Sequence, residues 1–455
     1  MPTENERVHL PPAFRRMAWS NLAAQLAEQI GLAAAPLLAV LVFHAGAGQT
    51  GLLQTAQTLP FLLLAAPAGV LADRVSRRAL MVAAEGTRAL ALLSVLLLLI
   101  ADRLSLPMLA AIGFLGATGT VAYNVGGPAL LPSIVPREAL ASANGRLELA
   151  RSSAFAAGPA LGGALVGWLG ASAAYAFATT TSVFAIVMLR GLVEPERAPL
   201  APRSPLRELR HGAQFVLGSS LLRPIMLTAV FFNVGWFVLQ AAFVPYAVRV
   251  LHLSSFGIGL TMGIFGAGMV VGSLLAPSLA RHLRFGTVVL LGPLGGLVGA
   301  LLMALTIELP SPWLAGLSFF FFGLGPIIWA ISSTTLRQAI TPSSMLGRTG
   351  ALVLMATLGA RPVGAALGAF LGSRYNEEAC LLTALLAFFA QFVIIASSAV
   401  TRLAVLPSSE RAEPGVLFLA SSPSVPSELV AKPRRGRSWQ PRWRYASDRA
   451  RAAAR

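Results

Sequence analysis

Polar side chains recur at helical spacing near the start of the chain, within a stretch that is otherwise apolar. Asn21, Gln25, Glu28 and Gln29 would share one face of a helix. Glu28 is the only acid near the centre of a long apolar stretch, where a charge is costly enough to indicate function. A buried carboxyl group can take up and release a proton near neutral pH. We therefore expect Glu28 to couple proton movement to activity; the alternative is a structural hydrogen bond to a neighbouring helix.

Two arginines also lie deep in apolar stretches. Arg88 follows Glu85 by three residues, which predicts an ion pair within one helix. Arg361 has no acid near it in the sequence. It is expected to pair with Glu28 across a cavity or to contact an anionic group of a ligand; the structural alternative is snorkelling or binding to backbone carbonyls.

These residues are expected to line one central cavity. The predicted cavity residues are Asn21, Gln25, Glu28, Arg88, Asn124, Asn233, Trp236, Gln240 and Arg361. Opposite Glu28, the second half of the chain offers the aromatic face of Trp236, a pairing that favours an amphipathic or cationic organic substrate. Glu148 and Arg151, three residues apart, are interpreted as a structural pair.

Twelve apolar stretches, each long enough to cross a bilayer, extend from about residue 14 to residue 402. Backbone polar groups in lipid must be satisfied within the chain, so each stretch should be a helix. The chain is 56% hydrophobic and 12% charged, about half the charged fraction of a soluble protein. The sequence therefore predicts an all-α membrane protein with twelve transmembrane helices, the last over 378–402.

The longest internal loop divides the chain into two halves. The expected segments are an N-terminal cytoplasmic tail (1–13), a six-helix bundle (14–192), a cytoplasmic linker (193–221), a second six-helix bundle (222–402) and a basic, disordered cytoplasmic tail (403–455). Within the linker, residues 206–222 would form either an amphipathic helix on the membrane or an irregular segment. The basic tail could bind anionic lipid.

Arginines concentrate in the loops on one side of the predicted bundle, from Arg15 and Arg16 onward, whereas the other side carries only Arg103, Arg249 and Arg374. By the positive-inside rule, both termini are expected to be cytoplasmic.

The two halves resemble each other. Arg15 precedes His44 by 29 residues, and Arg223 precedes His252 by the same interval. The predicted helices over 143–168 and 348–373 both follow a similar loop and contain a proline before small residues. Two such matches in the same order indicate duplication. A parallel repeat would place a substrate cavity between the bundles near mid-bilayer.

The loop between predicted helices 2 and 3 reads Gly69-Val70-Leu71-Ala72-Asp73-Arg74-Val75-Ser76-Arg77-Arg78. It resembles the loop signature of the major facilitator superfamily. The resemblance implies a cytoplasmic latch in which Asp73 contacts the start of the predicted helix over 348–373, where Arg348 is the candidate partner. The expected latch residues are Gly69, Asp73, Arg74, Arg77, Arg78 and Arg348. The alternative is that these arginines only set topology.

Helix 5 resembles the antiporter motif of the same family's exporters through Gly145, Gly158, Pro159, Gly162 and Gly163, although Ala154 replaces one glycine. The glycines would form a smooth packing face, and the proline would bend the helix. The predicted helix over 107–130 lacks the arginine that many drug–proton antiporters carry in the same helix. With Gln25 and Glu28 in helix 1, the pattern resembles bacterial siderophore-secretion and macrolide-efflux proteins of the cytoplasmic membrane.

Other protein classes are disfavoured. The single cysteine excludes an internal disulfide, and no metal-ligand spacing, paired catalytic set or nucleotide-binding loop is present, so we expect no enzyme, cofactor or metal. A net charge of +17 spread over loops and tails does not favour nucleic acid. The sequence predicts a monomeric secondary transporter that exports small organic molecules by alternating access, in exchange for protons. Alternatives are an importer or lipid-moving facilitator on this fold, or a non-transporting scaffold or sensor.

Overall fold

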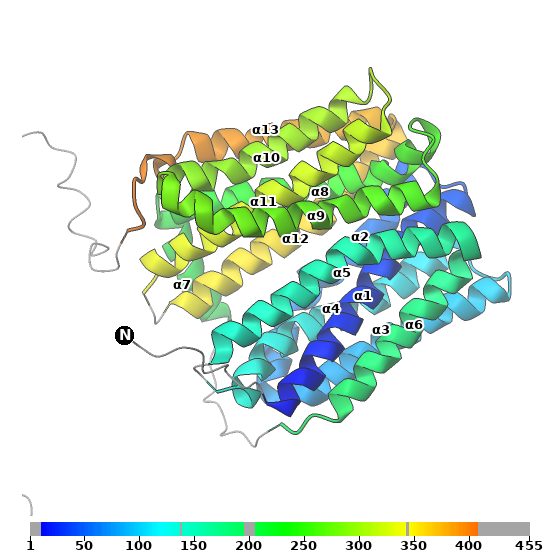
Figure 1. Cartoon of the computed structure of the whole chain (residues 1–455), viewed down its shortest axis with the longest axis horizontal. Coiled ribbons are helices and arrows are strands. Elements are labelled where there is room, and N and C mark those ends of the chain that lie inside the picture. The colour runs from blue at the N-terminus through cyan, green and yellow to red at the C-terminus, as the bar shows by residue number, and fades with distance from the viewer. Residues whose placement is uncertain (1–10, 137–138, 195–204, 343–344, 408–455) are drawn as a thin grey trace, which may run out of the picture. The chain divides into compact units, whose positions relative to one another are not determined.

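The computed structural model describes residues 11–136, 139–194, 205–342 and 345–407 (Figure 1). All of them belong to one compact unit, Met1–Ser409. The predicted basic tail beyond residue 407 and most of the predicted N-terminal tail lie outside the described residues.

The described residues form helices and no strands. The first half contains α1 (Pro12–Leu41), α2 (Ala47–Arg74), α3 (Arg77–Ile100), α4 (Leu106–Ile134), α5 (Leu140–Leu169) and α6 (Ala171–Arg190). The linker contains α7 (Pro205–Gly218). The second half contains α8 (Leu222–Arg249), α9 (Ser255–His282), α10 (Phe285–Leu305), α11 (Pro312–Ile340), α12 (Leu346–Arg374) and α13 (Glu377–Ala396), followed by a 3-10 turn, η2 (Ala399–Arg402).

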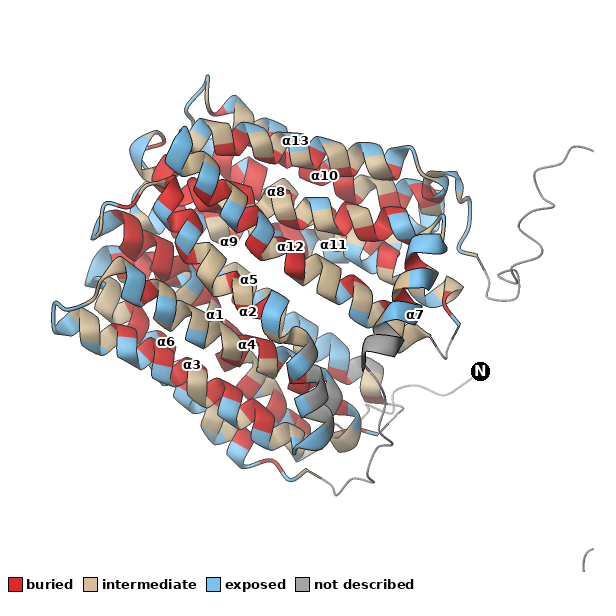
Figure 2. Ribbon diagram, turned by 180° about the vertical axis from the view of Figure 1, so that it is seen from behind, coloured by how far each residue is buried: buried red, intermediate tan, exposed pale blue. Residues whose placement is uncertain are grey.

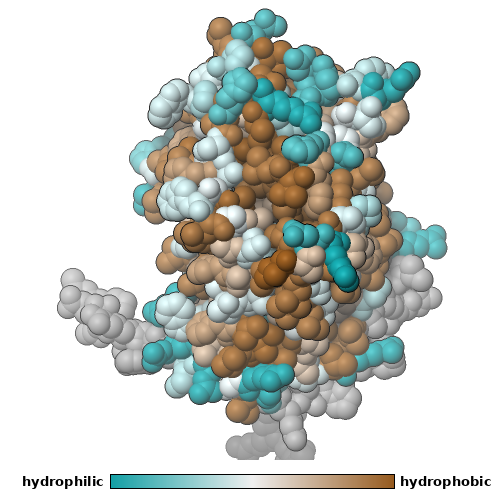
Figure 3. All heavy atoms as spheres, turned by 90° about the vertical axis from the view of Figure 1, so that its right-hand side faces the viewer, coloured by the Kyte–Doolittle hydropathy of each residue, from teal (hydrophilic) through white to brown (hydrophobic). Residues whose placement is uncertain are grey.

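In the described part of the chain, eleven helices are long and apolar enough to cross a membrane. The twelfth long helix, α2, falls outside this set, and part of it lies outside the described residues. Broad hydrophobic areas, interrupted by hydrophilic clusters, cover the face seen in Figure 3. Exposed leucines such as Leu90, Leu97 and Leu386 suit a lipid environment.

Helix ends follow local capping chemistry. The Ser76 hydroxyl accepts from the Ala79 N–H at the start of α3, and the Asn376 side chain accepts from the Ala379 N–H at the start of α13. The predicted last span, 378–402, was too long. The α-helix ends at Ala396, and Ser398 caps the separate turn η2.

The two halves repeat each other at the level of single backbone hydrogen bonds. His44 and His252 both adopt a positive φ, of 52° and 51°, in the loops that follow α1 and α8. The Ala45 N–H donates to the Ala39 carbonyl in the first half, and the Leu253 N–H donates to the Ala247 carbonyl in the second. The same ending of an α-helix, with one residue in the left-handed region, appears in both halves, so the matching histidines reflect a shared backbone conformation.

Helix packing follows the same repeat. In the first half α1 packs on α5 and α6, and α3 on α4 and α6; in the second half α8 packs on α12 and α13, and α10 on α11 and α13. Figure 1 shows the helices of the two halves as neighbouring groups, and Figure 2 shows buried residues on the helix faces turned inward. The halves meet where α2 contacts α8 and α12, and where α5 contacts α9.

The halves pack closely at the end of the bundle that carries the 42–46 and 250–254 loops, which we call the closed end. Thr50 of α2 donates to the Ala241 carbonyl of α8 at 2.5 Å, and Gln54 donates to the Gln240 carbonyl at 3.0 Å. A Cβ at Gly51 would lie 2.6 Å from the Ala369 Cα atom of α12. Only glycine permits this approach of α2 to α12.

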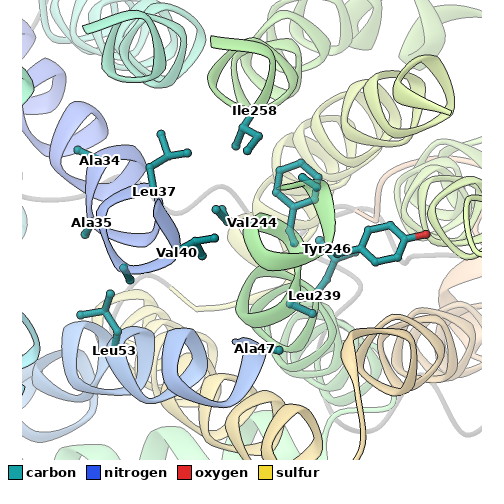
Figure 4. Close-up of a cluster of buried hydrophobic side chains, with 14 of the residues drawn as sticks. Ala34, Ala35, Leu37, Val40, Ala47, Leu53, Leu239, Val244, Tyr246 and Ile258 are labelled. Carbon is teal, nitrogen blue, oxygen red and sulfur yellow. The ribbon is translucent and has the colours of Figure 1, made fainter. Parts of the chain in front are cut away.

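A buried apolar cluster fills the closed end. Figure 4 shows Leu37 and Val40 of α1 facing Val244 of α8, with Ile258 of α9 close by. All four side chains are at most 5% exposed. Because both halves contribute to one apolar core, opening this end requires the exposure of packed side chains.

Candidate functional site: a central cavity

A cavity of about 580 Å³ lies between the two halves, and each of the twelve long helices contributes to its lining. Its charged lining residues, within the described chain, are Glu28, Arg88, Arg151, Arg337 and Arg361. Toward the end opposite the closed end, the lining continues to Ile225, Arg337 and Val353, near the ends of α8, α11 and α12.

Arg88 connects three helices beneath the cavity. It donates to the Glu85 carboxylate at 2.7 Å and to the Ala24 carbonyl of α1 at 3.2 Å. The predicted ion pair between Glu85 and Arg88 is therefore confirmed. The other guanidinium nitrogen donates to Thr120 of α4 at 3.0 Å. Glu85 is fully buried and also accepts from the Ser182 hydroxyl of α6.

Glu28 lies at the edge of this network and faces the cavity. Its carboxylate is 3.5 Å from the Arg88 guanidinium, and its side chain keeps 17% of its surface exposed. Arg88 is already paired with Glu85 at the shorter distance. Protonation of Glu28 would therefore leave Arg88 with a counter-charge, which a buried cation needs.

Arg361 occupies the opposite wall, on α12. Its Nε donates to the Asn233 side-chain oxygen at 3.3 Å, and the Asn233 amide donates to the Ala229 carbonyl at 2.9 Å. The guanidinium carbon lies 5.4 Å from the Phe61 ring centroid and 5.6 Å from that of Phe237. The structure shows no ion pair between Arg361 and a described acid, Glu28 included.

Aromatic rings form the wall around Trp236. Its ring centroid lies 4.9 Å from that of Phe265, 5.2 Å from that of Phe322 and 5.7 Å from that of Phe319. Such tilted and edge contacts are the favoured geometry for aromatic pairs. The wall is therefore rigid and apolar, and Trp236 lies in the cavity lining.

Several buried polar atoms in the described lining have no hydrogen-bond partner. They are Gln54 Oε1, Arg88 Nε, Tyr175 Oη, Thr228 Oγ1, Trp329 Nε1 and Gln391 Nε2. Buried polar groups are ordinarily satisfied, and water or a polar ligand in the cavity would satisfy these. The cavity is thus amphipathic, with polar groups set among aromatic and aliphatic walls.

Six of the nine predicted cavity residues line the cavity: Glu28, Arg88, Asn233, Trp236, Gln240 and Arg361. The other three do not. Gln25 is buried within the helix packing, and Asn21 donates to the Leu147 carbonyl of α5 at 3.4 Å. Asn124 is exposed on α4.

Polar lining residues on α2 and α5 were not predicted from the sequence. Gln54, Gln57 and Thr58 line the cavity, and their spacing of three and four residues was a legible signal. Arg151 makes the predicted pair with Glu148, at 2.7 Å, and that prediction is confirmed. Arg151 also lines the cavity, which the pair alone did not indicate.

The glycines of the helix 5 motif divide between two neighbours. A Cβ at Gly162 would lie 3.2 Å from the Ile30 carbonyl oxygen, and one at Gly158 would overlap Gln29, so both pack on α1. A Cβ at Gly163 would lie 2.8 Å from the Gly259 Cα atom of α9. Pro159 lies within the helix, and Gly145 is exposed with open space around it. Through these glycines, α5 packs on α1 of its own half and on α9 of the other half.

The start of α3 is hydrogen-bonded to the segment that follows α6 through Glu194, a residue that was not predicted from the sequence. Glu194 accepts from the Ser76 hydroxyl at 2.5 Å and from the N–H groups of Arg77 and Arg78 at 3.1 and 3.0 Å. Partial burial would raise the pKa of Glu194, but these hydrogen bonds and the charge of Arg77 outweigh it and lower the pKa.

The predicted latch is only partly described. Gly69 and the side chain of Asp73 lie outside the described residues, so the contact of Asp73 with Arg348 stays a prediction. Arg74 is exposed at the end of α2. Arg348 lies in the first turn of α12, where α7 packs: a Cβ at Gly212 would lie 2.9 Å from the Arg348 carbonyl oxygen. The linker thus contains a helix docked on α12, instead of an irregular segment.

A helical protein with two repeated halves, apolar outer faces and one central amphipathic cavity has the architecture of a membrane transporter. The sequence profile of the Major Facilitator Superfamily matches residues 17–365. The chain belongs to this superfamily and is a multi-pass membrane transporter with its twelve-helix fold.

Named relatives are exporters. The chain is 29% identical over 380 residues to the enterobactin exporter EntS of Citrobacter koseri, covering 81% of this chain and 87% of the relative. It is also 29% identical over 323 residues to the enterobactin exporter EntS of Salmonella typhimurium, covering 68% of this chain and 74% of the relative.

Solved structures share the fold. A bacterial homologue of the iron transporter ferroportin, in an inward-facing state, superposes with a TM-score of 0.67 at 17% identity, covering 84% of this chain and 98% of that one. A bacterial homologue of the human lysosomal transporter Spinster, inward-facing and unoccupied, gives a TM-score of 0.66 at 15% identity, covering 86% and 97%.

Proposed function

We propose that this transporter exports small organic molecules from the bacterial cytoplasm by alternating access, in exchange for protons that bind Glu28. The observation that carries the proposal is the position of Glu28. It is a carboxylate at the cavity surface whose partner, Arg88, keeps a second and closer counter-ion in Glu85. Glu28 can therefore gain or lose a proton while the buried Arg88 keeps a counter-ion.

The conformation supports loading from the cytoplasm. If both termini are cytoplasmic, the closed end faces outward, and the cavity extends toward the cytoplasmic ends of α8, α11 and α12. The relatives named as enterobactin exporters support outward transport.

The test is transport in everted membrane vesicles with an imposed pH gradient and a panel of organic substrates. With an acidic lumen, the wild type should accumulate at least one substrate, because protons leave as the substrate enters. Glu28→Gln should lower the gradient-driven part about tenfold or more, since a proton carrier is lost.

Glu308→Gln is the matched control, because Glu308 is exposed between α10 and α11. Gradient-driven accumulation that survives in Glu28→Gln would remove the proton role. Accumulation that requires an alkaline lumen would instead support symport and the importer alternative.

A further inference from the structure

The charged lining of the cavity favours anions. In the described chain it contains four arginines and Glu28. Arg88 is paired with Glu85 and Glu28, and Arg151 with Glu148. Arg337 and Arg361 have no ion pair among the described residues. A cavity with excess positive charge attracts anionic ligands and repels cations, which favours the amphipathic over the cationic alternative among the expected substrates.

Arg361 presents its free hydrogen-bond donors to this cavity. Its Nε is held by Asn233, whereas its two terminal nitrogens donate to no group of the described chain. Asn233 is itself held by the Ala229 carbonyl, so the guanidinium has a supported orientation. A guanidinium with both terminal nitrogens available can bind a carboxylate or a similar planar anion with two parallel hydrogen bonds.

Aromatic rings surround the same guanidinium. Phe61 of α2 and Phe237 of α8 come from different halves, and both face the Arg361 side chain. Trp236 adds a further ring in the lining, one residue from Phe237 along α8. An anion attached to an aromatic ring could therefore pair with Arg361 while its ring stacks on this wall.

We propose that Arg361, Asn233, Phe61 and Phe237 form a subsite for an anionic group carried on an aromatic ring, which deepens the proposed function by naming the substrate class. The guanidinium provides the counter-charge, Asn233 positions it, and the rings select a flat apolar body. Because Phe61 and Phe237 lie in opposite halves, a ligand bound there contacts both.

The test uses three probes of one shape: 2-naphthoate (anionic), 2-naphthamide (neutral) and 2-naphthylmethylammonium (cationic). Binding to the full chain in phosphatidylcholine nanodiscs is measured by titration calorimetry, with empty nanodiscs subtracted. In the wild type, naphthoate should bind about tenfold or more tighter than naphthamide, because charge-assisted hydrogen bonds are the stronger ones. The cation should bind most weakly.

Arg361→Gln should reduce the preference for naphthoate over naphthamide to within about twofold and leave naphthamide affinity nearly unchanged, since the rings remain. Arg361→Lys should retain part of the preference, because it keeps the charge and loses the planar fork. Arg103→Gln, which removes an exposed arginine outside the cavity, is the matched control. Size-exclusion profiles and circular dichroism verify that each variant is folded.

Three results would overturn the subsite: an anion preference that persists in Arg361→Gln, equal or tighter wild-type binding of the cation, or no binding of any probe. These outcomes are independent of the vesicle experiment. Anion-selective binding without export would leave the subsite standing and remove the proposed function. Export without charge-selective binding would leave the proposed function standing and remove the subsite.

Discussion

The third helix of each half begins beside the segment that follows that half's sixth helix, but the groups that meet there differ. At α3 the Glu194 carboxylate accepts from the N–H groups of Arg77 and Arg78. At α10 the N–H groups of Phe285 and Gly286 donate to the carbonyls of Ala404 and Leu403. The free N–H groups at the start of the helix donate to a titratable carboxylate in the first half and to neutral peptide carbonyls in the second.

The arginines beside the cavity differ in the same way. Arg88 in the first half is paired with Glu85 and Glu28 and donates to Thr120. Arg361 in the second half has Asn233 and two aromatic rings. The repeat thus preserved helix packing, while the acid that lines the cavity lies in the first half and most of the aromatic lining lies in the second. Under the two proposals above, chemistry that depends on protons belongs to the first half, and selection of the ligand's charge belongs to the second.

The largest expected effect comes from neutralising each arginine in turn. Arg88→Gln leaves the buried Glu85 without its cation and should destabilise the fold by about 3–5 kcal/mol. Arg361→Gln breaks no ion pair and should cost about 1 kcal/mol or less. Thermal unfolding of the purified variants in one detergent measures the difference. Equal losses of stability would contradict the contrast between the halves.

The contact between the halves gives a second, intermediate effect. A Cβ at Gly163 would press on α9, so Gly163→Ala should loosen the closed end, at a cost of about 1–3 kcal/mol. Gly86→Ala is the matched control, since nothing lies within 4 Å of a Cβ there. Hydrogen exchange of the 42–46 and 250–254 loops should rise in the first variant only. Unchanged exchange would show that this end is not held by α5 and α9.

The smallest expected effect is at Glu194. Because the pKa of Glu194 is lowered, its carboxylate stabilises the start of α3 fully at pH values above the ordinary carboxyl pKa of 4.5. This stability is lost as the pH falls through the lowered pKa. Glu194→Gln should speed exchange of the α3 first turn about two- to fivefold at pH 7.

That difference should vanish in acid, when wild-type Glu194 is protonated. The start of α10, which relies on peptide carbonyls, should show no such pH dependence. Glu308→Gln serves as the control at an exposed acid. A wild-type α3 turn that exchanges as fast as the variant at pH 7 would contradict the capping role.

Local features of the structure were predictable from the sequence. The pair of Glu85 with Arg88 and that of Glu148 with Arg151 depend on a spacing of three residues in one helix, which any helix imposes. The histidines that match between the halves mark two identical helix endings. The twelve-helix architecture followed from segment length and from the needs of the backbone in lipid.

Features that depend on helix rotation were not predictable. Gln25 and Glu28 lie on one side of α1, but only Glu28 reaches the cavity, because neighbouring helices cover Gln25. The partner of Glu28 is Arg88 instead of Arg361, a choice set by how α3 packs beside α1. Glu194 is far from Ser76 in sequence, and only the fold brings its carboxylate to α3.

Cys380 is the single cysteine of the chain, and it is fully buried in α13, where its sulfur lies 3.5 Å from the Gly368 carbonyl oxygen. Water-soluble thiol reagents should therefore leave the native protein unmodified. Spin labels or fluorophores can then be attached at pairs of introduced surface cysteines without first removing a native one. Pulsed-resonance or energy-transfer distances across the two halves would record how they move during a transport cycle.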